Sequence, residues 1–121
     1  AFEEAFPGVG LQPVHGDCPP VNVFPGVERD LHSDFELVTL GPVEWDLAAL
    51  GPKHRAAYDR GAKRHGIRTL NEDVVDFVNA VGMLRAVASL MFAPQLPVLV
   101  EYLRPSVEHW AATPFAGVPA G

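Results

Sequence analysis

The chain has 121 residues, of which 48% are hydrophobic and 20% are charged, so it can form one domain with its own core and is not disordered throughout. Cys18 is the only cysteine, which excludes an internal disulfide framework and a cysteine-based zinc site. A reducing, cytoplasmic setting is therefore expected. No apolar run approaches the roughly 20 residues that span a bilayer. Residues 1–10 also lack the basic start of a signal peptide, so no membrane association is expected.

The net charge of −6 is unevenly distributed along the chain. Residues 1–50 hold nine acidic side chains and one basic side chain, Arg29. Phosphate groups repel such a surface, so nucleic acid is not an expected partner. The acidic half would suit metal cations or a cationic substrate, and an acidic, solvated surface explains it equally well.

Short apolar segments separated by turn residues predict a β part in the first forty residues. We expect a helix end and a Pro7-Gly8 turn within residues 1–10, and then strands over 11–14, 21–24 and 31–37. The Pro25-Gly26 turn makes the last two strands a hairpin.

The rest of the chain predicts helices over 43–50, 53–65, 72–92 and 98–110, the last interrupted at Pro105. Gly66 is expected to end the second helix, and Thr69 with Glu72 forms a capping-box pattern before the third. One apolar stripe on that third helix is expected in the core: Val74, Val78, Val81, Leu84, Val87 and Met91. We expect one α+β domain over residues 1–112, mostly α-helical with a short β hairpin, followed by a flexible Pro/Gly/Ala tail over 113–121.

Three motifs follow one another in the first half of the chain. Residues 15–22 read His-Gly-Asp-Cys-Pro-Pro-Val-Asn, which has the His-x-Asp-x-x-x-x-Asn spacing of kinase catalytic loops. Residues 34–36 read Asp-Phe-Glu and lie where such folds place a metal-binding aspartate. Residues 41–48 read Gly-Pro-Val-Glu-Trp-Asp-Leu-Ala.

Taken in this order, the motifs resemble the aminoglycoside phosphotransferase and choline kinase superfamily over residues 15–48. The resemblance implies the C-terminal, catalytic lobe of a protein-kinase-like fold. It also implies an enzyme that transfers a phosphoryl group from ATP, with Mg²⁺ as cofactor, to a hydroxyl of a small molecule. The acidic half favours a cationic acceptor such as an aminosugar or amino alcohol.

Roles for three side chains follow from this resemblance. Asp17 would be the catalytic residue that orients the acceptor hydroxyl and takes its proton. Asn22 and Asp34 would supply oxygen ligands to Mg²⁺, which prefers such ligands. The alternative for Asn22 and Asp34 is that both are ordinary turn-forming residues of the hairpin.

Three further residues receive supporting roles from the same resemblance. The ring of His15 is expected to pack beneath the catalytic loop. Asp46 is expected to accept hydrogen bonds from the backbone of that loop. Glu36 is a candidate for contact with substrate or with a second metal ion, and a solvated strand glutamate is the simpler interpretation.

Two departures from the family pattern bear on activity. The segment before Asp34 is polar, so that residue is expected to be held more loosely than in an active enzyme. The N-terminal lobe that would hold ATP, with its phosphate-covering loop and lysine, is expected to be absent. The isolated chain is therefore expected to be weakly active or inactive, to need the missing lobe or a partner chain, and to self-associate through exposed apolar surface.

Two alternative functions remain at the level of sequence. His15 with Asp17, and His32 with Asp34, are two His-x-Asp pairs that could hold zinc in a metallohydrolase. The chain could also be an inactive kinase lobe that works as a binding module or only with a partner chain. A tight zinc site, as opposed to weak magnesium binding, would distinguish the first alternative.

Overall fold

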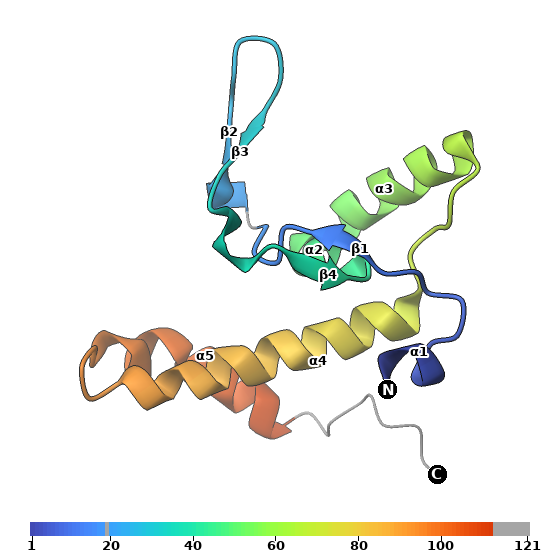
Figure 1. Ribbon diagram of the computed structural model, residues 1–121. Helices are drawn as coiled ribbons and strands as arrows, with labels where there is room; N and C mark the ends of the chain where they lie inside the picture. Colours follow the sequence, from blue (N-terminus) through green and yellow to red (C-terminus); the bar gives the residue numbers. More distant parts are fainter. Residues whose placement is uncertain (19, 113–121) are drawn as a thin grey trace. The chain divides into compact units, whose positions relative to one another are not determined.

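The computed structural model describes residues 1–18 and 20–112, and it confirms the predicted α+β class (Figure 1). Helices dominate, and the described strands form two small antiparallel sheets. The chain divides into two compact units, of which the first is Ala1–Val75 and the second begins at Asp76. The three motifs all lie in the first unit, and the predicted tail over 113–121 lies outside the described residues.

The first unit contains both sheets. Strand β2 (Val23–Phe24) pairs with β3 (Leu31–His32) and forms the predicted hairpin, with Val23 opposite His32. Strand β1 (Gln12–Val14) pairs instead with β4 (Thr39–Gly41), a strand that the sequence pattern did not predict. This second pairing brings the beginning of the first motif close to the beginning of the third, because β1 ends directly before residue 15 and β4 ends at Gly41.

The hairpin strands are shorter than predicted. The strand expected over 31–37 ends at His32, because Asp34 adopts φ 64° and ψ 58°, a left-handed conformation that cannot continue a strand. A 3-10 turn, η2 (Phe35–Leu37), follows it. In the same way, the strand expected over 21–24 begins only after the 3-10 turn η1 (Pro20–Asn22).

The helices of the first unit lie close to their predicted positions. They are α1 (Phe2–Ala5), α2 (Glu44–Leu47) with its 3-10 extension η3 (Ala48–Leu50), and α3 (Pro52–His65). Helix α3 begins with a proline, whose missing N–H has no partner in a first helical turn anyway. It ends as predicted at Gly66, which takes a left-handed φ of 66° and donates its N–H to the carbonyl of Lys63.

Helix α4 (Glu72–Ala88) begins at a different cap from the one predicted. The side-chain oxygen of Asn71 accepts hydrogen bonds from the N–H groups of Asp73 (3.0 Å) and Val74 (3.3 Å). These are two of the donors that a helix leaves unpaired at its start. The Thr69–Glu72 capping box is therefore wrong, and Asn71 is the capping residue.

The second unit contains most of α4, the 3-10 turn η4 (Ser89–Phe92) and α5 (Val98–Ala112). Helix α5 continues through Pro105, so the predicted interruption is wrong. Pro105 has no N–H, so the helix continues there without the backbone hydrogen bond that this residue would otherwise donate.

The apolar stripe predicted for α4 is buried only near the start of the helix. Val74 and Val78 are buried, whereas Leu84 and Met91 are exposed. The other buried apolar side chains among the described residues are Val9, Val14, Ala48, Ala62, Leu70, Val75 and Leu103. The continuous stretch Glu72–Phe92 is, by length and composition alone, apolar enough to cross a membrane, which differs from the expectation that no segment approaches that length.

Candidate catalytic loop and its anchors

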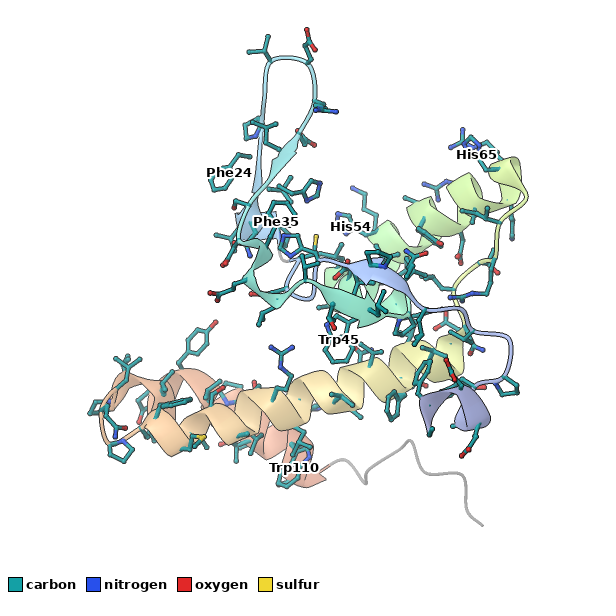
Figure 2. All side chains as sticks on the ribbon, in the orientation of Figure 1. Phe24, Phe35, Trp45, His54, His65 and Trp110 are labelled. Atoms are coloured by element: carbon teal, nitrogen blue, oxygen red, sulfur yellow. The ribbon has the colours of Figure 1, made fainter. Side chains whose placement is uncertain are left out.

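Helix α2 holds the start of the candidate catalytic loop, residues 15–22, through two neighbouring side chains. The carboxylate of Asp46 accepts hydrogen bonds from the backbone N–H groups of His15 (2.7 Å) and Gly16 (2.9 Å). The indole of Trp45, labelled in Figure 2, donates its N–H to the carbonyl oxygen of Gly16 at 3.0 Å. Because hydrogen bonds to an ionised acceptor are stronger than neutral ones, Asp46 fixes the backbone immediately before Asp17.

Only glycine fits at position 16, for two independent reasons. Its φ is +85°, a value that residues with a Cβ rarely adopt. A Cβ added there would also lie 2.1 Å from the carbonyl oxygen of Leu37. The loop therefore passes directly against the backbone of the η2 turn, which follows Asp34.

His15 connects the loop to the residue that precedes Asp34. The side chain is 9% exposed, and its Nε2 lies 2.8 Å from the carbonyl oxygen of Ser33. Its ring packs against that of Phe35, with 4.8 Å between the ring centroids. The Nδ1 atom is buried and has no hydrogen-bond partner among the described residues. His15 thus lies beneath the loop and anchors it to the η2 turn.

Asn22 ties the far end of the loop back to Asp17. Its side-chain Nδ2 donates to the carbonyl oxygen of Asp17 at 3.1 Å. Its own carbonyl oxygen accepts a hydrogen bond from the N–H of Ser33 at 3.0 Å. Since the Asp17 carbonyl only accepts, the amide nitrogen of Asn22 must face it, and no described residue donates a hydrogen bond to the Oδ1 oxygen.

The three candidate carboxylates on this loop and turn are exposed. Asp17, Asp34 and Glu36 accept no hydrogen bond from any side chain or N–H in the part of the chain that the structure describes. Asp34 is also the only described non-glycine residue with a positive φ. Strained conformations of this kind persist where surrounding contacts impose them, and they concentrate at functional sites. Here the neighbouring Ser33 supplies such contacts.

Cys18 lies beside Asp17 but is not suited to be a nucleophile. Burial raises the pKa of its thiol, and the negative charges of Asp46 and Asp17 raise it further. At neutral pH the thiol therefore stays protonated, and the thiolate is the reactive form.

The structure also contains an ion pair with a buried carboxylate that the sequence analysis missed. Glu44 is fully buried and holds Arg68 through two hydrogen bonds, 2.5 Å from Oε1 to Nη1 and 3.0 Å from Oε2 to Nη2. Oε1 also accepts the backbone N–H of Asn71 at 2.8 Å. Burial alone would raise the pKa of Glu44, but the hydrogen bonds and the charge of Arg68 outweigh it and lower the pKa.

One sequence signal could have pointed to half of this pair. Glu44 lies two residues before Asp46 in the third motif, so it belongs to the same short helix that holds the loop. Nothing in the sequence singles out Arg68, which follows 24 residues later among several other basic residues.

Two side chains near the loop carry hard oxygen donors. These are the carboxylate of Asp34 and the amide oxygen of Asn22, and Mg²⁺ commonly takes one or two such protein ligands while phosphate and water complete its shell. No group of three or more His, Cys, Asp or Glu side chains within residues 1–18 and 20–112 is placed to hold a metal ion. Zinc sites are typically built from such groups.

Comparisons with protein-family models, with curated proteins and with solved structures find no match for this chain.

Proposed function

We propose that the chain is the catalytic-loop part of a small-molecule kinase, which transfers a phosphoryl group from ATP to a substrate hydroxyl. The observation that carries this proposal is a continuous series of three hydrogen bonds that links residues 17, 22, 33 and 15. Asn22 bonds to the carbonyl of Asp17, Ser33 bonds to the carbonyl of Asn22, and the ring of His15 bonds to the carbonyl of Ser33. The backbone next to all three candidate functional residues is thereby held together.

Phosphoryl transfer requires mainly positioning and charge neutralisation, which is what such a loop can supply. The exposed carboxylate of Asp17 would accept the proton of the acceptor hydroxyl while that oxygen bonds to the γ-phosphorus and the bond to the β-phosphate oxygen breaks. Asn22 and Asp34 would hold Mg²⁺, which supplies neutralisation of the phosphate charge when bound. Glu36, two residues beyond Asp34, is available to a cationic acceptor or a second metal ion.

The proposal includes a requirement for groups outside residues 1–121. The sequence carries no glycine-rich phosphate loop followed by a sheet lysine, and both are needed to hold the triphosphate. We propose that an additional lobe or a partner chain supplies them. The same proposal places the protein in the cytoplasm, where ATP and magnesium are available, and takes a cationic aminosugar or amino alcohol as the preferred class of acceptor.

A thermal-shift comparison of metal and nucleotide combinations tests this proposal. The kinase function predicts that Mg²⁺ and ATP added together stabilise the chain more than either does alone, and only weakly, because the groups that would hold the triphosphate lie outside residues 1–121. Stabilisation by Zn²⁺ alone at low concentration would instead favour the metallohydrolase. No stabilisation by any combination, even with both ligands in large excess, would contradict the assignment of metal and nucleotide binding to this loop.

A further inference from the structure

Helix α2 is held by contacts on two sides. Toward the loop, Trp45 and Asp46 make three hydrogen bonds to the backbone of residues 15 and 16. Toward the α3–α4 connection, Glu44 makes three hydrogen bonds, two to Arg68 and one to the N–H of Asn71. The three side chains are consecutive, so both sets of contacts originate from one turn of helix.

A four-residue helix cannot hold its own position. Helices this short are unstable in isolation, because the first turn orders several residues for one hydrogen bond. The position of α2 therefore depends on its side-chain anchors. The Glu44 side chain is 0% exposed, whereas the acidic partners in the ion pairs Arg55–Glu72 and Arg104–Glu101 are 73% and 76% exposed. Glu44 is thus the only fully buried carboxylate among these ion pairs.

We propose that the Glu44–Arg68 pair is a positioning pair for the catalytic loop, acting through α2 on the backbone that precedes Asp17. This inference rests on the proposed function only for what the loop does. The intact pair adds little net stability, since desolvation of the Glu44 carboxylate offsets its attraction to Arg68, although removing one partner is costly because it leaves the other without its hydrogen bonds. Its two parallel hydrogen bonds instead fix direction, and here they fix the rotation of the turn that presents Asp46 to the loop.

The neighbouring contact of Asp59 provides a matched control. Its carboxylate accepts the backbone N–H of Leu70 at 2.9 Å, so it anchors the same connection, and the described residues show no hydrogen bond between Asp59 and α2. Glu101, exposed and paired with Arg104, provides a second control for loss of a glutamate charge. Only Glu44 both anchors the connection and belongs to α2.

Amide hydrogen exchange measured by NMR on the full chain, without metal or nucleotide, tests the inference. The Glu44→Gln variant is expected to exchange the His15 and Gly16 amides on the order of tenfold faster, because their bonds to Asp46 loosen. It is also expected to shift the indole resonance of Trp45, with Trp110 as the internal reference. Asp59→Asn and Glu101→Gln should leave these signals unchanged.

An unchanged exchange rate at His15 and Gly16, together with faster exchange at Asn71, would overturn the inference, since Glu44 would then serve only the start of α4. If Glu44→Gln unfolds the chain, Arg68→Lys keeps the positive charge and removes one of the two hydrogen bonds, and the same signals decide the question. Because no nucleotide is present, this outcome is independent of whether the chain binds ATP.

Discussion

Replacing Gly16 by alanine tests how tightly the loop is packed against the η2 turn. The added Cβ would lie 2.1 Å from the Leu37 carbonyl oxygen, which is 1.3 Å short of the 3.4 Å at which ordinary contact begins. The loop must therefore move, and a movement of that size breaks the 2.9 Å hydrogen bond from Gly16 to Asp46. The left-handed backbone costs about 1–2 kcal/mol and the lost bond to a charged group about 1.5–3 kcal/mol, so we expect a loss of roughly 3–5 kcal/mol.

The matched control is Gly8→Ala. Gly8 has the same φ of +85°, but an added Cβ would meet no atom within 4 Å. It therefore suffers only the backbone strain, at most about 1–2 kcal/mol, partly offset because alanine also restricts the unfolded chain. Urea unfolding followed by circular dichroism measures both variants, and a loss of about 4 kcal/mol moves the midpoint by roughly 2 M. Equal midpoints for the two variants would refute the close approach of the loop to Leu37.

Three further predictions concern the neighbours of the loop. Hydrogen bonds and the charge of Arg68 lower the pKa of Glu44 in the folded state, so its contribution to stability is present above its unfolded pKa and is lost as pH falls through its folded pKa. Glu44→Gln should reduce the free energy of unfolding by about 2–3 kcal/mol at pH 7. The same variant should show a smaller decrease of the urea midpoint as the pH is lowered. The raised pKa of Cys18 should make iodoacetamide labelling of its thiol slow at pH 7. Asp17→Asn should accelerate the labelling severalfold by removing a nearby negative charge, and an unchanged rate would mean that the Asp17 carboxylate does not act on this thiol. Asn71→Ala should cost about 1 kcal/mol in thermal or urea unfolding and Thr69→Ala much less, and the reverse order would restore the capping box.

Local patterns in the sequence predicted the parts of the fold that depend on neighbouring residues. The hairpin, the position of α3 and its end at Gly66 follow from turn residues and from the helix-ending preference of glycine. The left-handed conformation of Asp34 was not predictable in this way, because the contacts of Ser33 with His15 and Asn22 determine it.

The pairing of β1 with β4 was missed because it joins residues 25 to 29 positions apart, from Val14–Thr39 to Gln12–Gly41, and β4 has only three residues. The burial of Glu44 was missed for a related reason. Glutamate and arginine are rarely buried, and only the folded chain brings Arg68 to Glu44 from 24 residues away. The apolar stripe of α4 was predicted to lie in the core along its whole length. The helical spacing of its apolar residues is correct, but Leu84 and Met91 are exposed.

We propose that Asn22 and Asp34 hold the divalent ion of a nucleotide, and titration with Mn²⁺ and ATP followed by NMR tests this proposal most directly. The paramagnetic ion should broaden the side-chain amide signals of Asn22. Asp34→Asn, which tolerates the left-handed backbone but removes the charge, should abolish that broadening, and Asp30→Asn should retain it. Equal broadening of the Asn22 signals in the unmodified chain and in Asp34→Asn would contradict the claim.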